Sequence, residues 1–240
     1  MSGRQHGSGE NWLWGVHAVS AALANPKRKL TRLLGTKNGL DRLGQIQARG
    51  EVVEPYAIDA LLPRDSVHQG LAAQFEPLPT VQIDDLIEGE CRRIAVLDQV
   101  SDPHNLGAIF RSAAAFGFGG LVLQTRNAPA ITGIVAKSAV GAIETVQECR
   151  VVNISRALEA LNDAGYHTVG LAGAGDASIE AAVSGAGKLA VVLGAEGPGL
   201  RPGVAKACAE LARIPITAEM ESLNVSNAAA IAFYEAARNG

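Results

Sequence analysis

The 240-residue sequence is short of cysteine and of long apolar runs. Its three cysteines, Cys91, Cys149 and Cys208, are far apart and form neither a CxxC pair nor a His–Cys cluster, so a disulfide framework and a zinc site of the usual spacing are excluded. We therefore expect no metal, and free thiols fit a reducing cytoplasm. No apolar stretch approaches the roughly 20 residues of a membrane span, so no membrane partner is expected.

Aromatic residues and positive charge are also scarce. Aromatics make up 4% of the chain, which argues against aromatic platforms for stacking bases, and the net charge is −3. The charge is nevertheless uneven, at +3 over residues 1–75 and −6 over residues 76–240. The basic residues concentrate in PKRKLTRLLGTK, residues 26–37. Such a patch can bind RNA phosphates, although a solvated basic turn is the alternative. The candidate RNA-binding residues are Lys27, Arg28, Lys29 and Arg32.

The length allows two modest domains. Residues 1–10 lack the apolar core of a signal peptide and are expected to be a flexible tail. Residues 11–75 predict a small α/β domain, with a helix within 13–25, a strand from 30, a helix within 40–50 and a strand over 52–58. Residues 76–90 combine two prolines with a cluster of acids, which predicts a linker before a second domain at 91–240.

The second domain alternates brief apolar runs with helical stretches. The runs are RIAVLD (93–98), LVLQ (121–124), TVGLA (168–172), LAVVLG (189–194) and RIPI (213–216). This pattern predicts an α/β fold with an open, mainly parallel sheet buried on both faces. Ligands of such sheets bind beyond the carboxyl ends of the strands.

Three of these strand ends carry polar or glycine-rich segments. They are 102–117, which holds Asn105; 191–202, with three glycines around Glu196; and 214–238, where Ser222 and Asn224 precede a helix of small residues. The glycines of GAEGPG are spaced GxxGxG, so the dinucleotide fingerprint and the P-loop both fail. Each loop alone predicts a tight turn, but the three together predict a ligand site.

The helix of the first segment, within NLGAIFRSAAAFG, carries one arginine on an almost bare face. An apolar stripe of Leu106, Ile109, Phe110 and Ala113 would face the core. Arg111 would point the opposite way, where its neighbours are Gly107, Ala108, Ala114 and Ala115. A face this bare lets a partner approach closely, although an exposed arginine without a partner is equally compatible with the segment alone.

In this order, DPHNLGAIFRSAAAFG, LGAEGPGLR and IPITAEMESLNVSNAAAIAFYE resemble the three motifs of the SpoU (TrmH-like) family of RNA ribose 2′-O-methyltransferases in the SPOUT superfamily. KSAVGAIE, residues 137–144, adds an intermediate similarity. WGVHAVSAALANP resembles the ribosomal-protein-like RNA-binding domain of many members, notably the bacterial 23S rRNA guanosine 2′-O-methyltransferases. One departure is Ala218, where many relatives have glycine.

The resemblance implies a carboxyl-terminal trefoil knot, a bent S-adenosylmethionine held within it, and a homodimer with the active site near the interface. It assigns cofactor contacts, largely through backbone groups, to Gly194, Ala195, Gly197, Ile214, Ile216, Leu223 and Asn224. It assigns the reacting centre to Asn105, Arg111, Glu196, Ser222 and Asn224. A structural role is compatible with several of these positions, since Ile214 and Leu223 can pack in the core and Glu196 and Asn224 can satisfy loop amides.

The implied reaction is an in-line transfer of the sulfonium methyl group to a ribose 2′-oxygen, without a metal. The arginine would stabilise negative charge on that oxygen rather than act as a base, because a guanidinium seldom gives up its proton. The expected substrate is a guanosine of 23S rRNA. The alternatives are 2′-O-methylation of tRNA and a non-catalytic RNA-binding or ribosome-assembly protein with the same fold.

Overall fold

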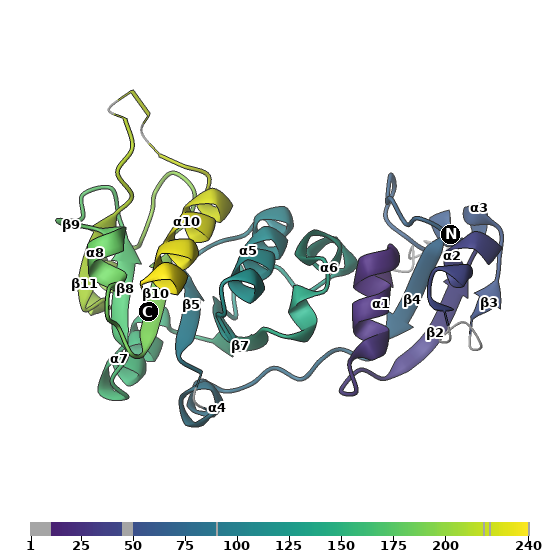
Figure 1. Ribbon diagram of the computed structural model, residues 1–240, viewed down its shortest axis with the longest axis horizontal. Coiled ribbons are helices and arrows are strands. Elements are labelled where there is room, and N and C mark those ends of the chain that lie inside the picture. The colour runs from purple at the N-terminus through teal and green to yellow at the C-terminus, as the bar shows by residue number, and fades with distance from the viewer. Residues whose placement is uncertain (1–10, 45–49, 90, 218, 221, 240) are drawn as a thin grey trace, which may run out of the picture. The chain divides into compact units, whose positions relative to one another are not determined.

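The computed structural model describes residues 11–44, 50–89, 91–217, 219–220 and 222–239 (Figure 1). The expected flexible tail, residues 1–10, and Ala218 lie outside these ranges. The described chain divides into two compact units. The first holds the residues up to Pro79 together with Ala130–Glu144, and the second holds Thr80–Pro129 and the residues from Thr145 onward.

The first unit is built on a four-stranded sheet of order β1-β4-β2-β3, in which only β2 and β3 are parallel. Its elements are β1 (Trp12–Trp14), α1 (Val16–Ala24), β2 (Leu30–Gly35), α2 (Lys37–Asp41), β3 (Glu51–Val52), α3 (Pro55–Asp59), β4 (Leu71–Phe75), α6 (Gly133–Ala139) and the 3₁₀ helix η2 (Ala142–Glu144). The predicted first helix and first strand are confirmed as α1 and β2.

Two predictions in the first unit are wrong at their boundaries. The strand expected over residues 52–58 stops at Val52, because Pro55 occupies the first turn of a helix, where its missing amide has no cost. The second helix begins before its expected range, at Lys37, because Thr36 caps it by accepting a hydrogen bond from the Gly39 amide at 3.1 Å. Residues 45–49 of the expected helix lie outside the described residues.

Residues 130–144 pack into the first unit, although the sequence assigns them to the second domain. Helix α6 lies so close to β1 that a Cβ at Gly133 would come within 1.8 Å of the Trp14 ring. The guanidinium of Arg28 pairs with the carboxylate of Glu144 at 2.9 Å, and the two side chains are only 7% and 5% exposed. Asn25 donates a further hydrogen bond to Glu144 at 2.7 Å.

The segment expected to be a linker, residues 76–90, is partly helical. Helix α4 (Ile83–Glu88) begins with a capping box between Gln82 and Asp85. Leu86 of this helix is fully buried in the core of the second unit. The second half of the segment is therefore part of the second unit rather than a connection to it.

The second unit contains the predicted open parallel sheet, here of seven strands in the order β7-β6-β5-β10-β8-β11-β9. The strands are β5 (Arg93–Leu97), β6 (Gly120–Gln124), β7 (Gln147–Val151), β8 (His167–Leu171), β9 (Ala177–Ser178), β10 (Leu189–Leu193) and β11 (Glu210–Arg213). All their pairings are parallel. The strand predicted at 213–216 is wrong, because β11 ends at Arg213 and the chain then turns away from the sheet with Pro215.

Both faces of this sheet are buried, as the apolar runs predict. Along β5, Ile94 and Val96 contact the core cluster that includes α7 (Ile154–Asp163) and α9 (Pro202–Ala207). Ala95 and Leu97, which point to the opposite face, are at most 1% exposed. Helices α5 (Pro103–Ala115), α8 (Ile179–Val183) and α10 (Val225–Arg238) form a second group, in which α10 contacts both others (Figure 1).

Candidate cofactor and catalytic site

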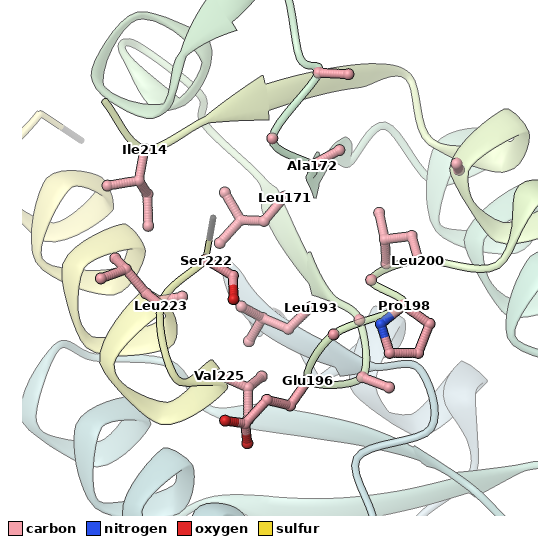
Figure 2. Close-up of a pocket in the computed structure, with 18 of the residues that line it drawn as sticks. Leu171, Ala172, Leu193, Glu196, Pro198, Leu200, Ile214, Ser222, Leu223 and Val225 are labelled. Atoms are coloured by element: carbon pink, nitrogen blue, oxygen red, sulfur yellow. The ribbon is translucent and has the colours of Figure 1, made fainter. Parts of the chain in front are cut away.

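A pocket of about 370 Å³ lies at the carboxyl ends of three neighbouring strands, β10, β8 and β11. Its walls include Leu171 at the end of β8, Leu193 at the end of β10 and Ile214 after β11. Figure 2 shows the Leu171, Leu193 and Leu223 side chains around the same space, with the Ser222 hydroxyl among them. A pocket of this size with apolar walls is typical of small-molecule sites, which span about 300–1,000 Å³.

The glycine-rich loop after β10 forms one wall of this pocket. The Ala195 and Gly199 backbones exchange two hydrogen bonds, at 3.2 and 3.0 Å, which closes residues 195–199 into a tight turn. Gly197 and Gly199 have φ of 87° and 69°, a region that favours glycine. A Cβ at Gly194 would come within 2.1 Å of the Gly199 backbone. The three glycines are therefore required by the path of the chain.

A second wall comes from the loop after β8, which the sequence analysis missed. Ala172, Gly173 and Ala174 line the pocket together with Leu171. The side chain of Arg213 donates hydrogen bonds to the carbonyl oxygens of Gly175 at 2.5 Å and Asp176 at 2.9 Å, which ties this loop to the end of β11. The signal was present in the sequence, because TVGLA is followed directly by the glycine-containing GAGD.

Most of the expected cofactor residues line the pocket. They are Gly194, Ala195, Gly197, Ile214, Ile216 and Leu223. Asn224 does not line it, although its neighbours Leu223 and Val225 do. The apolar side chains offer a slot for an aromatic base, and the turn presents main-chain groups that can bind its edge and a ribose. This combination of apolar walls and main-chain hydrogen-bonding groups fits S-adenosylmethionine.

Expected catalytic residues from three separate segments meet beside the pocket. The Asn224 side-chain amide donates to Asn105 Oδ1 at 3.1 Å and to Glu196 Oε2 at 3.5 Å. The Asn224 oxygen accepts hydrogen bonds from the Ser226 amide at 2.9 Å and the Ser226 hydroxyl at 2.6 Å, which caps α10. These bonds fix the direction in which the Asn224 amide donates. Glu196 and Ser222 line the pocket and are exposed.

Arg111 lies on the exposed side of α5, as predicted. Leu106, Ile109, Phe110 and Ala113 are all buried, so the predicted apolar stripe is confirmed, but Gly107 is also buried and does not belong to the bare face. Within the described chain, Arg111 has no hydrogen bond or ion pair, and it is not among the residues that line the pocket. Its guanidinium is therefore available to a group from outside this chain.

The basic cluster is more internally paired than the sequence predicts. Arg28 is buried against Glu144, so its guanidinium has a structural role and cannot also bind a phosphate. Lys29 pairs with Glu76 at 2.6 Å and Arg32 with Glu51 at 2.9 Å, both on the surface. The exposed cations of this cluster are Lys27, Lys29 and Arg32.

Taken together, fold and pocket define an α/β protein whose parallel sheet binds a small molecule at the carboxyl ends of its strands, beside a polar cluster that can contact a second substrate. The sequence model of the SpoU rRNA Methylase family matches residues 92–234, and the model described as "RNA 2'-O ribose methyltransferase substrate binding" matches residues 12–81. The chain therefore belongs to the SpoU rRNA methylase family.

Curated relatives and solved structures agree with this family. The chain is 34% identical to the 23S rRNA (guanosine-2'-O-)-methyltransferase RlmB of Photobacterium profundum, over 94% of this chain and 96% of that protein. It is 38% identical to an uncharacterized tRNA/rRNA methyltransferase of Synechocystis, over 93% of this chain but only 61% of that longer protein. An AdoMet-bound rRNA methyltransferase from Sinorhizobium meliloti superposes with a TM-score of 0.80 at 25% identity, over 95% of this chain and 86% of that one.

As a member of this family, the chain is an RNA 2′-O-ribose methyltransferase whose cofactor is S-adenosylmethionine. When bound, the cofactor supplies a methyl group already activated by a positively charged sulfur. The described chain has no helix long and apolar enough to cross a membrane.

Proposed function

We propose that the protein methylates the ribose 2′-oxygen of a guanosine in 23S rRNA. The observation that carries this proposal is the full-length correspondence with the Photobacterium enzyme, which spans both the substrate-binding region and the methylase region. A match confined to the methylase region would leave the choice of RNA open. A substrate of this kind places the enzyme in the cytoplasm.

The residues of the reacting centre would have separate roles. Arg111 would stabilise the negative charge that develops on the ribose 2′-oxygen, or hold the adjacent phosphate with two parallel hydrogen bonds. Asn105 and Asn224 would position the ribose, since their amides already hold each other at 3.1 Å. Glu196 and Ser222 would bind donors and acceptors of the substrate at the mouth of the pocket. Gly194, Ala195, Gly197, Ile214, Ile216 and Leu223 would hold the cofactor.

The three exposed cations of the basic cluster, Lys27, Lys29 and Arg32, would contact RNA phosphates. The surface pairs of Lys29 and Arg32 with carboxylates do not prevent this, because an exposed ion pair is weak and exchanges its partner readily. The substrate-binding family match over residues 12–81 supports this role for the unit that contains them.

We also propose that the protein acts as a homodimer that uses the exposed face of α10. Phe233 of this helix is not available for such a contact, because it is fully buried against Phe118 with ring centroids 4.1 Å apart. The same helix instead exposes Ile231 and Tyr234, at 37% and 49%. Arg111 is exposed on the adjacent helix α5 and has no partner within the described chain. A second copy of the chain packed against this face would lie beside Arg111, so that the two copies together could bind the RNA there.

The test is methyl transfer from labelled S-adenosylmethionine to RNA from cells that lack the gene. Purified protein is incubated with 23S rRNA, 16S rRNA and tRNA in parallel. We expect label in 23S rRNA alone. Label in tRNA would show that tRNA is the substrate instead of 23S rRNA. A protein that binds RNA without labelling any of the three would be a non-catalytic family member.

A further inference from the structure

Asp98 is an ionisable side chain with no accessible surface, which the mechanism above does not use. It directly follows β5 and is one of two buried polar residues in the described chain, with Thr168. Among the described residues, the hydrogen bonds to its carboxylate come from one residue, Arg201. The Arg201 backbone amide donates to Oδ2 at 3.0 Å, Nε donates to Oδ1 at 2.8 Å, and Nη2 lies 2.6 Å from Oδ1.

Asp98 also contacts the other end of the glycine-rich loop, residues 194–200. The Asp98 amide donates to the carbonyl oxygen of Leu193, the last residue of β10, at 2.8 Å. Residues 194–200 connect Leu193 to Arg201, and all seven line the pocket. Asp98 therefore holds both ends of the loop, one through its backbone and the other through its carboxylate.

The Arg201 guanidinium extends this connection along the sheet. Its Nη2 lies 3.4 Å from the side-chain oxygen of Gln124, at the end of β6. Arg201 is also the N-cap residue of α9. The pair thus joins the carboxyl ends of β5, β6 and β10 to the start of the helix that follows the loop.

From this geometry we infer that Asp98 and Arg201 are a positioning pair, which holds the 194–200 loop in the shape that binds the cofactor and directs Glu196 towards Asn224. Neither residue lines the pocket, so each acts through the loop. The inference rests on the proposed use of this pocket for S-adenosylmethionine.

Stability alone does not explain a charged pair at this place. Removing the Asp98 carboxylate from water is costly, and the Arg201 side chain that compensates its charge is itself 39% exposed, so the pair is only partly buried. Cys208 lies within reach of this charge. Its own burial, followed by the charge of Asp98, raises the pKa of the Cys208 thiol to about 12. An apolar pair would fill the space but could not bind the Arg201 amide and so could not fix the end of the loop.

The test uses the variants Asp98→Asn, Arg201→Lys and the double variant Asp98→Leu/Arg201→Met in the full chain. Glu180→Gln is the matched control, because it breaks the exposed Arg238–Glu180 pair in the same unit. Two readouts are measured on each protein, beside the KM for the cofactor and the kcat of methyl transfer. The first is amide hydrogen exchange of residues 194–201 without cofactor, and the second is the affinity for S-adenosylhomocysteine by calorimetry.

We expect Asp98→Asn to accelerate exchange in the loop and to weaken S-adenosylhomocysteine binding by about tenfold or more, the usual effect of losing hydrogen bonds to a charged group. The KM for the cofactor should rise more than kcat falls. Arg201→Lys keeps the charge and the backbone donor, so it should recover part of the affinity. The double variant fills the space with apolar side chains but lacks the carboxylate, so it should not recover the affinity.

Wild-type exchange and affinity in a folded Asp98→Asn protein would overturn the inference. Should Asp98→Asn fail to fold, a double variant that is folded and binds S-adenosylhomocysteine like the wild type would overturn it as well. Failure of the wild-type protein to bind S-adenosylhomocysteine would instead disprove the cofactor site, because loop exchange without cofactor is measured independently.

Discussion

Gly194 occupies a position where a single methyl group decides whether the pocket can form. A Cβ there would come within 2.1 Å of the Gly199 backbone, so Gly194→Ala must open the turn that the cofactor contacts. We expect S-adenosylhomocysteine binding to fall below detection in calorimetry while the circular dichroism spectrum is kept. Gly187→Ala is the control, because a Cβ at Gly187 would meet no atom within 4 Å. Wild-type affinity in Gly194→Ala would place the cofactor elsewhere.

Arg111 is the residue on which the chemical step should depend most. Arg111→Ala should reduce single-turnover methyl transfer about 100-fold or more, the usual cost of losing one charge-stabilising group. Folding and cofactor binding should be unaffected, because the side chain is exposed and does not line the pocket. The variant Arg111→Lys should recover little of the methyl-transfer rate, since an ammonium group cannot make the planar, two-pronged contact of a guanidinium. A rate within a few-fold of the wild type would show that another group activates the ribose.

Among the individual residues, those that the sequence predicted best are the ones fixed by local chain geometry. The glycines at 194, 197 and 199 follow from the turn itself, and Asn224, which the sequence places just before a helix, caps α10. The pairing of Arg28 was not predicted, because nothing near it in sequence indicates that it pairs with Glu144, 116 residues away. Asp98 was overlooked for the same reason, since its partner Arg201 is 103 residues away.

The segment Ala130–Glu144 is the element whose placement departs most from the sequence expectation. Its pairing with the first unit can be tested with Glu144→Gln, which leaves the buried Arg28 guanidinium without a charged partner. We expect the free energy of unfolding of the first unit to fall by about 3 kcal/mol, as for other broken buried pairs. Denaturant unfolding followed by the fluorescence of Trp12 and Trp14, the only tryptophans of the chain, reports on this unit.

The control for this prediction is Lys29→Ala, which removes the exposed Lys29–Glu76 pair and should change stability by less than about 1 kcal/mol. Cofactor binding should be unchanged in both variants, because the pocket lies entirely in the second unit. Equal stability of Glu144→Gln and the wild type would mean that residues 130–144 do not depend on this pair. Deleting residues 1–75 is a poorer test, since it would also expose the side of α6 that packs against β1.

Element types were more predictable than element boundaries. Continuous apolar runs gave β5, β6, β8 and β10 within a residue or two, because strands buried on both faces carry few polar side chains. Strand β7, QECRV, escaped detection because it is an edge strand with one polar side. The third motif was read as a strand over 213–216, but Ile214 and Ile216 are apolar because they line the pocket.

At the scale of the whole molecule, the proposed homodimer can be tested by its mass in solution. Light scattering at micromolar concentration should give twice the mass of 24.8 kDa. Ile231→Asp on the exposed side of α10 should shift the protein to monomers, because it places a charge where an apolar contact is expected. Glu180→Gln, on α8, should leave the mass unchanged. A wild-type monomer would refute the dimer, and a dimeric Ile231→Asp protein would move the interface to another face.

The overall architecture followed from the sequence in two different ways. Periodicity alone gave the parallel α/β sheet and the carboxyl-end site, since both follow from local patterns. The two-unit plan came from the proline- and acid-rich segment at residues 76–90, and the chemistry came from the resemblance of three motifs to a family. The carboxyl-terminal knot stays a prediction of that resemblance, because no local pattern in a sequence encodes how a chain threads.

The central claim, that the methyl group is placed on a ribose 2′-oxygen of guanosine, is tested most directly by alkaline hydrolysis of the labelled RNA. Alkaline cleavage requires a free 2′-hydroxyl, so a 2′-O-methylated nucleotide leaves an alkali-resistant dinucleotide. We predict that the label from 23S rRNA is recovered in such dinucleotides with guanosine as the methylated nucleoside, and that the Arg111→Ala enzyme yields about 100-fold less or lower still. Label recovered in alkali-labile mononucleotides would show methylation of a base and would contradict the account.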